Sequence, residues 1–231
     1  VVAVSRRSAD EWERLVPRAT LDRDARDRTP GGAAFRASLT RPGVRIIAEC
    51  KRRSPSRGVL RATYDPAAIA RGYQAADAAA ISVLTEPTFF DGALDHLREV
   101  RAAVTTPLLR KDFVVTDYQV IEAATHGADA VLLIVAALDD ASLSRLLALA
   151  ADLGLAALVE VHDAGELDRA LAAGAAIVGV NSRNLRTLAV NQATLDELGP
   201  RIPSGVVAVA ESGLRTAEDL QRLTAIRYDA A

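Results

Sequence analysis

The chain has 231 residues, 50% of them hydrophobic, which suits one domain with a sizeable core. Its formal net charge of -2 gives no electrostatic reason to expect nucleic acid or an anionic membrane as a partner. A single cysteine, Cys50, excludes an intrachain disulfide, and no apolar run approaches the ~18 residues that a membrane span needs. Charged side chains interrupt residues 1–16, which do not resemble a signal peptide, so we expect a cytoplasmic protein.

Residues 1–44 precede the first predicted strand and are expected to form a helical extension. Ser8, with Glu11 three positions later, has the pattern of a helix N-terminus. The charged segment 20–32 ends in Pro-Gly-Gly and predicts a loop, and a short helix is predicted at 33–39. The sequence leaves open whether this extension covers one end of the domain or forms a loosely packed tail.

From residue 45 onwards, short apolar runs alternate with longer amphipathic segments. The runs predict strands at 45–50, 79–84, 107–111, 130–134, 157–161, 177–181 and 206–211. The amphipathic segments predict helices at 66–76, 92–103, 118–126, 140–153, 164–173, 192–198 and 216–224. Continuous apolar strands separated by helices indicate a parallel sheet covered by helices.

These units predict an α/β fold, a (β/α)8 TIM barrel over residues 45–231 that forms a single domain together with the extension at 1–44. The alternative is a doubly wound open sheet, which is weakened because no G-x-G-x-x-G follows the first strand. An eighth strand is predicted to start at Asp229. Because the sequence stops at Ala231, we expect the eighth βα unit to be truncated in this chain.

Ionisable or amide side chains end five of the predicted strands, after buried apolar runs. They are Glu49, Lys51, Lys111, Glu160, Asn181 and Glu211. In barrels of this kind the chemistry takes place at the C-terminal ends of the strands, so we expect these side chains to converge on one mouth. Strands that simply end at solvent explain one or two such residues but do not readily explain polar ends on five strands. Converging cations and carboxylates shift each other's pKa values, which is what acid–base catalysis uses.

Lysine is almost absent from the chain: of 28 basic residues, only Lys51 and Lys111 are lysines. Codon bias explains the excess of arginine, and such a bias leaves lysine mainly where arginine cannot replace it. Lysine can lose its proton or shift its pKa when it is desolvated, whereas arginine effectively cannot. Since both lysines stand at strand ends, we interpret both as candidates for acid–base catalysis.

Two weaker signals lie in loops on the same side. Residues 54–58, Ser-Pro-Ser-Arg-Gly, form either a binding loop or an ordinary turn. Phe89, Phe90 and Phe113 suit a flat apolar substrate or, equally, loop packing. The histidines lack metal-ligand spacing and are predicted to be structural, as is Cys50; they are His96, His126 and His162. We therefore expect no metal.

Seven segments together resemble the indole-3-glycerol phosphate synthase family, in order from about Arg45 to the end of the chain. They are IIAECKRRSPS at 46–56, ISVLTE at 81–86, LRKDF at 109–113, DAVLLI at 129–134, LVEV at 158–161, GVNSRNL at 179–185 and AESG at 210–213. The set is highly specific, although the Ser-Pro-Ser run alone would not be. The resemblance implies a lyase of tryptophan biosynthesis that works without cofactor or metal.

The family carries out ring closure, decarboxylation and dehydration of 1-(2-carboxyphenylamino)-1-deoxyribulose 5-phosphate, and releases indole-3-glycerol phosphate, carbon dioxide and water. The implied partner is thus a phosphorylated small molecule, with no nucleic acid and no membrane, and we expect a monomer or a weak homo-oligomer. By resemblance, Lys111 is the general acid that protonates the ribulose carbonyl, and Glu160 acts in the proton transfers of the dehydration. Glu49 and Lys51 form a charged pair beside the reacting centre, with Lys51 a second candidate acid.

The resemblance also implies a set of substrate contacts. Asn181 and Arg183 would hold hydroxyl and carboxylate groups of the substrate, and Glu211 and Ser212 would complete the polar wall. The remaining contacts would be Ser54 and Gly213 to the phosphate, and Phe89 and Phe113 beside the anthranilate ring.

Two alternatives remain. Another phosphate-binding barrel of the same pathway, such as the anthranilate isomerase, is expected to use a Cys/Asp pair instead of Lys and Glu at these strand ends. The other is a truncated barrel that binds a phosphorylated ligand with little or no turnover. The end of the sequence at Ala231 is its only support, because the family continues into a Gly-Ser phosphate-binding turn and a final helix.

Overall fold

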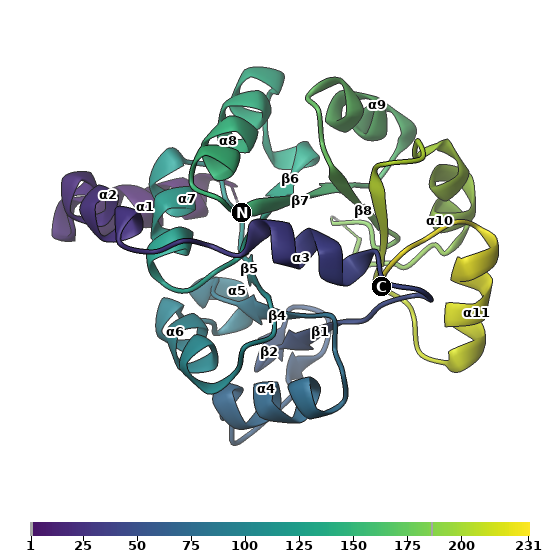
Figure 1. Ribbon diagram of the computed structural model, residues 1–231, viewed down its shortest axis with the longest axis horizontal. Helices are drawn as coiled ribbons and strands as arrows, with labels where there is room; N and C mark the ends of the chain where they lie inside the picture. The colour runs from purple at the N-terminus through teal and green to yellow at the C-terminus, as the bar shows by residue number, and fades with distance from the viewer. Residues whose placement is uncertain (1, 186) are drawn as a thin grey trace.

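The computed structural model describes residues 2–185 and 187–231. Seven parallel strands, paired in chain order, curl into a barrel wall with helices on its outside (Figure 1). The strands are β1 (Ile47–Cys50), β4 (Ala80–Leu84), β5 (Leu108–Lys111), β6 (Ala130–Ile134), β7 (Ala156–Val161), β8 (Ile177–Asn181) and β9 (Val207–Glu211). The helices between them are α4 (Pro66–Ala75), α6 (Leu94–Ala103), α7 (Asp117–Thr125), α8 (Asp140–Asp152), α9 (Ala164–Ala172), α10 (Ala193–Leu198) and α11 (Ala217–Ala225).

The sequential strand order confirms the predicted TIM-barrel fold and rules out the doubly wound alternative, whose strand order reverses at a switch point. The predicted strands and barrel helices agree with the structure to within two residues at each end. Short elements were not predicted: a hairpin of β2 (Arg53–Ser54) and β3 (Gly58–Val59), helix α5 (Pro87–Phe90), and 3-10 turns η1 (Val135–Ala137) and η2 (Gly199–Arg201). Within the described residues, each helix is too short or too polar to span a bilayer.

The barrel closes through the last residues of the chain. Ala230 forms parallel bridges with Val209 on β9 and with Arg45 just before β1. The backbone N–H of Arg45 donates to the carbonyl oxygen of Asp229 at 2.8 Å, and the N–H of Ala231 donates to the carbonyl oxygen of Arg45 at 2.8 Å. The eighth strand predicted at Asp229 is therefore present as a bridge that links both edges of the curled sheet.

Alternate side chains of each strand enter two separate cores. The inner core fills the barrel and includes Leu109 and Leu158. The outer core lies between the strands and the helices and includes Val159 on β7 and Leu146 on α8. Because side chains two positions apart share a face, the residue that follows Leu158 on the inner face is Glu160, at the end of the strand. The same alternation that places apolar side chains in the inner core therefore places polar side chains at the C-terminal opening of the barrel.

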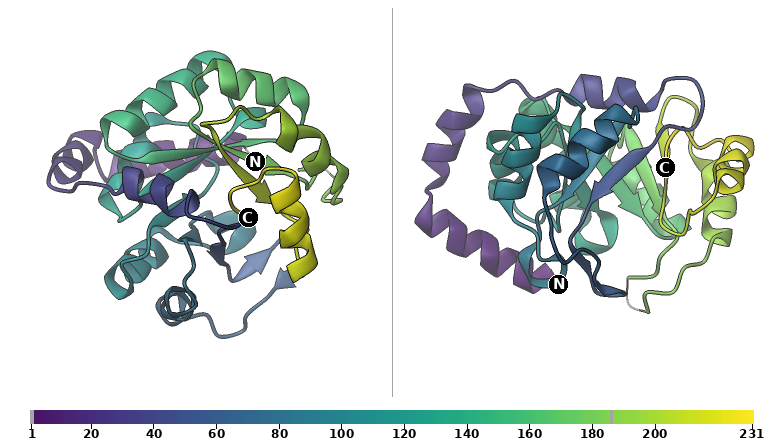
Figure 2. Two further views of the ribbon diagram at one scale, coloured as in Figure 1. Left: turned by 45° about the vertical axis from the view of Figure 1, so that its right-hand side comes forward. Right: turned by 90° about the horizontal axis from the view of Figure 1, so that it is seen from below.

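The N-terminal extension forms three helices, α1 (Val2–Leu15), α2 (Arg18–Arg26) and α3 (Gly32–Leu39). Helix α3 crosses the end of the barrel at which the strands begin (Figure 1), and Phe35 and Leu39 are fully buried in the inner core. Helices α1 and α2 pack beside α7, so that α1 begins at the opposite end of the barrel from α3 (Figure 2). The extension therefore covers one end of the barrel and is not a loose tail.

Two local predictions in the extension were wrong. Helix α1 begins at Val2, so Ser8 lies inside the helix and does not cap it. Helix α2 forms within the segment predicted as a loop, and its apolar residues Leu21 and Ala25 are buried. These two side chains are four positions apart and share one face of a helix, so packing against the barrel selects a helix in a segment whose charges alone suggest a loop.

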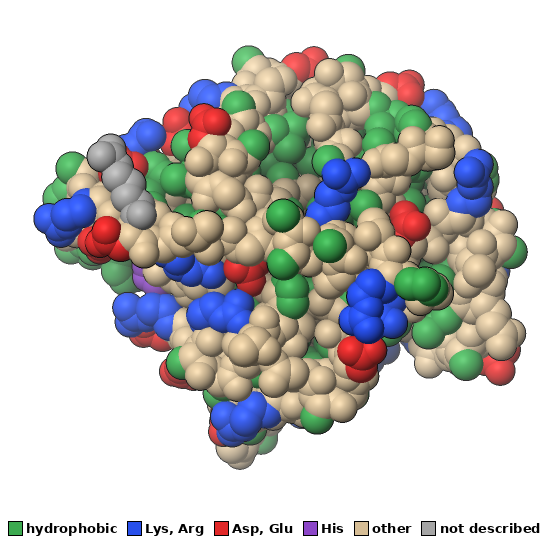
Figure 3. Space-filling view, in the orientation of Figure 1, with side chains coloured by type: hydrophobic (Ala, Val, Ile, Leu, Met, Phe, Trp, Pro, Cys, Tyr) green, Lys and Arg blue, Asp and Glu red, His purple; other side chains and the backbone are tan. Residues whose placement is uncertain are grey.

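A buried carboxylate attaches the extension to the barrel. Asp129, at the start of β6, accepts hydrogen bonds from the backbone N–H groups of Gly31 and Leu108, both at 2.9 Å. The same carboxylate pairs with Arg28 at 3.1 Å and Arg101 at 2.9 Å. On this side of the molecule, basic and acidic side chains are interspersed (Figure 3). One aspartate thus joins the segment before α3 to β5 and α6.

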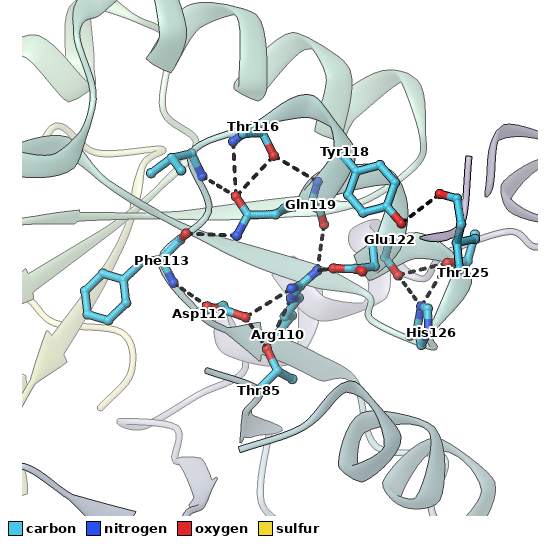
Figure 4. Close-up of polar contacts among 12 residues, drawn as sticks. Thr85, Arg110, Asp112, Phe113, Thr116, Tyr118, Gln119, Glu122, Thr125 and His126 are labelled. Carbon is cyan, nitrogen blue, oxygen red and sulfur yellow. Dashed lines mark hydrogen bonds and ion pairs between the residues drawn. The ribbon is translucent and has the colours of Figure 1, made fainter. Parts of the chain in front are cut away.

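Arg110 lies next to Lys111 on β5 but points away from the barrel interior, toward α7 (Figure 4). Its guanidinium group contacts the carboxylates of Asp112 at 3.0 Å and Glu122 at 2.8 Å, and it donates to the carbonyl oxygen of Gln119 at 2.8 Å. All of these side chains are buried. A desolvated arginine with two carboxylates fixes the end of β5 against the helix that follows.

The same network holds the segment between β5 and α7 (Figure 4). The Gln119 Oε1 atom accepts hydrogen bonds from the N–H groups of Val115 at 2.8 Å and Thr116 at 3.2 Å. The Gln119 Nε2 group donates to the carbonyl oxygen of Phe113 at 3.1 Å, and Asp112 Oδ1 accepts from the N–H of Phe113 at 2.8 Å. Lys111 and Phe113 therefore project from a strand and a turn that are held from behind.

We expect Phe35→Ala to lower the free energy of unfolding by about 3–5 kcal/mol, because it removes a buried ring from the inner core and leaves a cavity. Urea denaturation followed by circular dichroism measures the change. The matched control is Leu15→Ala in α1, since Leu15 is 72% exposed and its loss should change stability by less than about 0.5 kcal/mol. Equal stabilities of the two variants would contradict a packing role for α3.

A second stability prediction concerns Arg110→Met. The variant keeps an unbranched apolar stem but leaves Asp112 and Glu122 as buried carboxylates without their cation, at a cost of about 3–5 kcal/mol. Thermal and urea denaturation should both show the loss. Arg98→Met removes an exposed arginine that pairs with Asp95 and should leave the midpoint nearly unchanged. If both variants were equally stable, the network would contribute nothing beyond a surface ion pair.

Candidate active site

A cavity of about 1410 Å³ opens at the C-terminal ends of the strands. All twelve residues that the sequence predicted for the site line it: Glu49, Lys51, Ser54, Phe89, Lys111, Phe113, Glu160, Asn181, Arg183, Glu211, Ser212 and Gly213. They come from the ends of six of the seven strands, or from the segments that follow those strands. The structure therefore brings the whole predicted set into one cavity, as expected for strand ends of a barrel.

The strand register places the polar residues on neighbouring strands side by side. Glu160 on β7 pairs with Gly179 on β8, and Asn181 pairs with Glu211 on β9. A Cβ atom at position 179 would collide with the Glu211 Oε1 atom. A side chain at position 179 would therefore displace the Glu211 carboxylate, which occupies this space in the glycine-containing chain.

Lys111 is at the centre of the charged cluster. Its Nζ atom lies 2.8 Å from Glu211 Oε2 and 3.6 Å from Glu160 Oε2. Burial by itself lowers the pKa of Lys111, but the carboxylates of Glu211, Glu160 and Glu49 outweigh burial and raise the pKa above its ordinary value. The ammonium group is consequently protonated throughout the neutral range and available as an acid.

Glu160 has a second partner besides Lys111. Its side chain is 2% exposed, and its Oε1 atom lies 3.2 Å from His162 Nε2. Burial opposes ionisation of Glu160, but the close contact with His162 and the charge of Lys111 outweigh it and lower the pKa of the carboxyl below its ordinary value. Glu160 is therefore a carboxylate at neutral pH and can accept a proton.

The pKa of Glu211 is shifted in the opposite direction, above its ordinary value. Burial raises the pKa of its carboxyl, and the nearby charge of Glu160 adds to this, so that the attraction of Lys111 is not sufficient to restore the ordinary value. Its Oε1 atom is buried without a hydrogen-bond donor from the described part of the chain. Two neighbouring carboxyls whose pKa values move apart are a common arrangement in acid–base sites.

The rim of the cavity carries further polar groups. Lys51 Nζ forms an ion pair with Glu49 at the end of β1. The N–H of Arg183 donates to Asn181 Oδ1 at 3.0 Å, which sets the direction in which the chain leaves β8. Ser212 and Gly213 follow β9 with φ angles of 70° and 78°. A serine in the left-handed region is strained, and such strain is concentrated at functional sites.

The predicted binding loop at 54–58 is the β2–β3 hairpin at the edge of the cavity, and Ser54 is buried in it. Phe89 and Phe90 lie in helix α5 and not in a loop, because Glu86 caps the helix and accepts hydrogen bonds from the N–H groups of residues 88–90. The rings of Phe90 and Phe113 lie 6.5 Å apart. The three phenylalanines line one apolar part of the cavity wall.

Sequence reasoning missed two cavity residues and underrated a third residue. Ser82 on β4 points into the cavity opposite Glu49, and its hydroxyl is buried with no partner among the described residues. Glu86 lines the wall as the cap of α5. His162, predicted to be structural, contacts Glu160. Strand periodicity offered a signal for Ser82 and His162, since each lies two positions from a residue on the inner face.

The lone cysteine is not part of the site. Cys50 lies between Glu49 and Lys51 and therefore points to the other face of β1, where it is buried in the outer core. Burial, followed by the charge of Glu49, raises the pKa of its thiol to about 12. The alternative of an isomerase with a catalytic Cys/Asp pair at these strand ends consequently has no candidate cysteine.

Known proteins with the same overall shape include the N-acetylmannosamine-6-phosphate 2-epimerase of Clostridium perfringens, with a TM-score of 0.62 and 14% identity over 80% of this chain and 84% of that chain. A Rhizobium etli pyruvate carboxylase matches with a TM-score of 0.64 and 15% identity, over 87% of this chain and 24% of that one. At such low identity these likenesses show the barrel fold alone.

Sequence comparison is more specific. A family model described as indole-3-glycerol phosphate synthase matches residues 4–230. The indole-3-glycerol phosphate synthase of Chlorobium chlorochromatii is 54% identical over 199 residues, which cover 85% of this chain and 77% of the relative. That of a Nocardioides species is 58% identical over 188 residues, which cover 81% of this chain and 71% of the relative. Since the match spans nearly the whole chain and includes the strand ends that line the cavity, the chain belongs to the indole-3-glycerol phosphate synthase family.

Proposed function

We propose that this chain is an indole-3-glycerol phosphate synthase, a carbon–carbon lyase of tryptophan biosynthesis that acts on a phosphorylated small-molecule substrate. The observation that carries the proposal is the Lys111 ammonium group held between two buried carboxylates in the cavity of a chain of this family. The direct test is to incubate the purified chain with 1-(2-carboxyphenylamino)-1-deoxyribulose 5-phosphate and to follow the formation of the indole chromophore.

Ring closure requires an acid at the ketone oxygen of the substrate. In the proposed step, the ring carbon that bears the carboxylate attacks the ketone carbon, and Lys111 transfers its proton to the ketone oxygen. The surrounding carboxylates keep Lys111 protonated, so the acid is present in the required form. Loss of carbon dioxide then returns the bonding electron pair to the ring and restores its aromaticity.

The dehydration that follows removes a hydroxyl group and a proton from adjacent carbon atoms. Glu160 is ionised and lies 3.6 Å from Lys111, which supports a role as the base that takes the proton from the methylene carbon beside the nitrogen. Protonation of the departing hydroxyl would come from Lys51 or Lys111. The ion pair of Lys51 with Glu49 at the rim supports Lys51 as the second acid.

The phosphate would bind at the turn after β9 and at the hairpin after β1. Turns with left-handed residues present successive backbone N–H groups to anions, which supports Ser212 and Gly213 as phosphate contacts. Ser54, buried in the hairpin, would add a hydroxyl donor. A Cβ atom at position 213 would lie 2.7 Å from Val190 Cγ1, so the close approach of the two loops also depends on glycine.

The aromatic part of the substrate would lie against the phenylalanine side of the cavity, flanked by Phe89 and Phe113. Asn181 and Arg183 would hold its hydroxyl and carboxylate groups. One chain supplies every one of these residues, so we propose a monomer or a weak homo-oligomer as the working form. A barrel that binds ligand without turnover is not favoured, because the candidate acids and bases all line the same cavity.

We expect Lys111→Arg to reduce kcat by at least about 10²-fold while substrate binding is retained, because arginine keeps the charge but not the acidity. Turnover is measured by indole absorbance, and binding by calorimetry with an analogue in which the ketone is reduced to an alcohol. Lys51→Arg is the matched comparison, since it changes the other lysine in the same way. A larger loss for Lys51→Arg than for Lys111→Arg would transfer the role of the first acid to Lys51.

Glu160→Gln should reduce kcat by a factor on the order of 10² to 10⁴, the usual contribution of a positioned acid–base group. Stability should change little, because each cation retains an anionic partner. Lys111 still contacts Glu211, and His162 still contacts Glu166. Single-turnover kinetics and thermal denaturation separate the two effects. Normal turnover with an early melting transition would make Glu160 a structural residue.

A further inference from the structure

A row of three side chains leads from the cavity at the end of β7 into the first turn of α9. Glu160 Oε1 lies 3.2 Å from His162 Nε2, and His162 Nδ1 lies 3.0 Å from Glu166 Oε2. The backbone N–H of His162 also donates to Glu166 Oε2 at 2.8 Å. The His162 side chain is 15% exposed, between the buried Glu160 and the outer Glu166. The imidazole ring is therefore held between two carboxylates.

This geometry selects the protonated form of the ring. A neutral imidazole has one N–H donor and one acceptor nitrogen, whereas both nitrogens of His162 face an acceptor oxygen. Only the imidazolium form carries an N–H on both nitrogens, so that Nδ1 donates to Glu166 while the positive charge at Nε2 faces the Glu160 carboxylate. Burial by itself lowers the pKa of His162, but the hydrogen bonds and charges of Glu160 and Glu166 outweigh it and raise the pKa to about 10.

The other charges around the ring come from three further elements. Lys111 on β5 repels the imidazolium from behind Glu160, and Glu211 on β9 partly cancels that lysine charge. On α9, Asp163 caps the helix N-terminus, whose partial positive charge would also disfavour a cation. The carboxylates outnumber the cations on the sides that face His162, so its charge is favoured.

The position of Glu166 is itself fixed, so Glu160, His162 and Glu166 form a rigid row. Its backbone N–H donates to Asp163 Oδ1 at 2.9 Å in the first turn of α9. The outer carboxylate is thus set by the helix start, and it orients His162 through both the ring nitrogen and the backbone. Rigid partners of this kind hold a catalytic side chain within the narrow geometry that catalysis requires.

We infer that His162 is a positioning residue that, as an imidazolium anchored by Glu166, fixes one oxygen of Glu160 so that the other is aimed at Lys111 and the substrate. The inference rests on the proposed function, in which Glu160 is the base of the dehydration. It gives a role to a residue outside the cavity wall. The imidazolium also keeps Glu160 ionised, because it stabilises the carboxylate next to the ammonium group of Lys111.

The charge of His162 can be tested without any turnover. In protein labelled with nitrogen-15 at its three histidines, we expect the His162 ring to remain protonated at pH 8. The internal control is His126, whose pKa burial lowers and whose ring should be neutral at that pH. Glu166→Gln should lower the pKa of His162 while the histidine itself is retained. A neutral His162 at pH 8 would overturn the inference.

The same charge predicts a direction for stability. The folded-state pKa lies above the ordinary value of ~6.5, so the contribution of the two ion pairs is complete below about pH 6.5. It is lost as the pH rises through about 10. Glu166→Gln should weaken this loss at alkaline pH. Identical pH dependence of the melting temperature in wild type and variant would contradict the proposed pairing.

Kinetics test the positioning role. His162→Ala should lower kcat by about 10-fold or more with little change in KM, and should move the acidic limb of the kcat profile to higher pH as Glu160 loses its cation. His162→Gln, which keeps one N–H donor, should recover part of the loss in kcat. His126→Gln, outside the cavity, is the matched control with unchanged kinetics. If the folded His162→Ala variant kept the wild-type kcat and pH profile, the inference would be contradicted.

The two proposals fail in different ways. If wild-type protein forms no indole product, the proposed function is wrong, whereas the histidine titration still reports whether His162 is charged. If wild type turns over substrate and the His162 and Glu166 variants keep the same kcat and pH profile, only the positioning role is wrong. Should His162→Ala fail to fold, Glu166→Gln provides the kinetic measurement with His162 in place.

Discussion

The buried contact of Lys111 with Glu211 and Glu160 is the interaction on which the cavity depends. An ammonium group and two carboxylates are costly to desolvate, and they remain charged inside a barrel only because each compensates the others. Loss of Lys111 would leave the two neighbouring carboxylates without a shared cation. Burial and the charge of Glu160 raise the pKa of Glu211, whereas His162 and Lys111 lower the pKa of Glu160, so the two neighbouring glutamates differ in their tendency to ionise.

Both faces of β5 contribute to that interaction. The inner face presents Lys111 to the cavity, and the outer face places Arg110 in a second buried cluster with Asp112 and Glu122 (Figure 4). The two clusters do not share a side chain, but they share a strand, so the outer one holds the backbone from which Lys111 projects. The position of Lys111 therefore depends in part on the polar contacts of Arg110 on the outer face of the same strand.

The end of the barrel at which the strands begin contributes to stability. There α3 buries Phe35 in the inner core, and Asp129 joins the segment before α3 to β5 and α6. The inner core is continuous from this end to the layer just below the charged cluster. Stability is concentrated where the strands begin and chemistry where they end, a division that parallel barrels allow because all strands point the same way.

The sequence by itself determined the strands, the barrel and the polar strand-end residues that line the cavity. Periodicity of two along each strand places Lys111, Glu160 and Glu211 on the inner face, and that constraint is local, so it can be read from neighbouring residues. Tertiary structure alone decided α2, whose buried Leu21 and Ala25 need a surface to pack on, and the pairing of His162 with Glu160 and Glu166. These two features depend on which groups from distant segments come together in the folded chain. Burial and charge at those contacts outweigh the conformational preference of the local sequence.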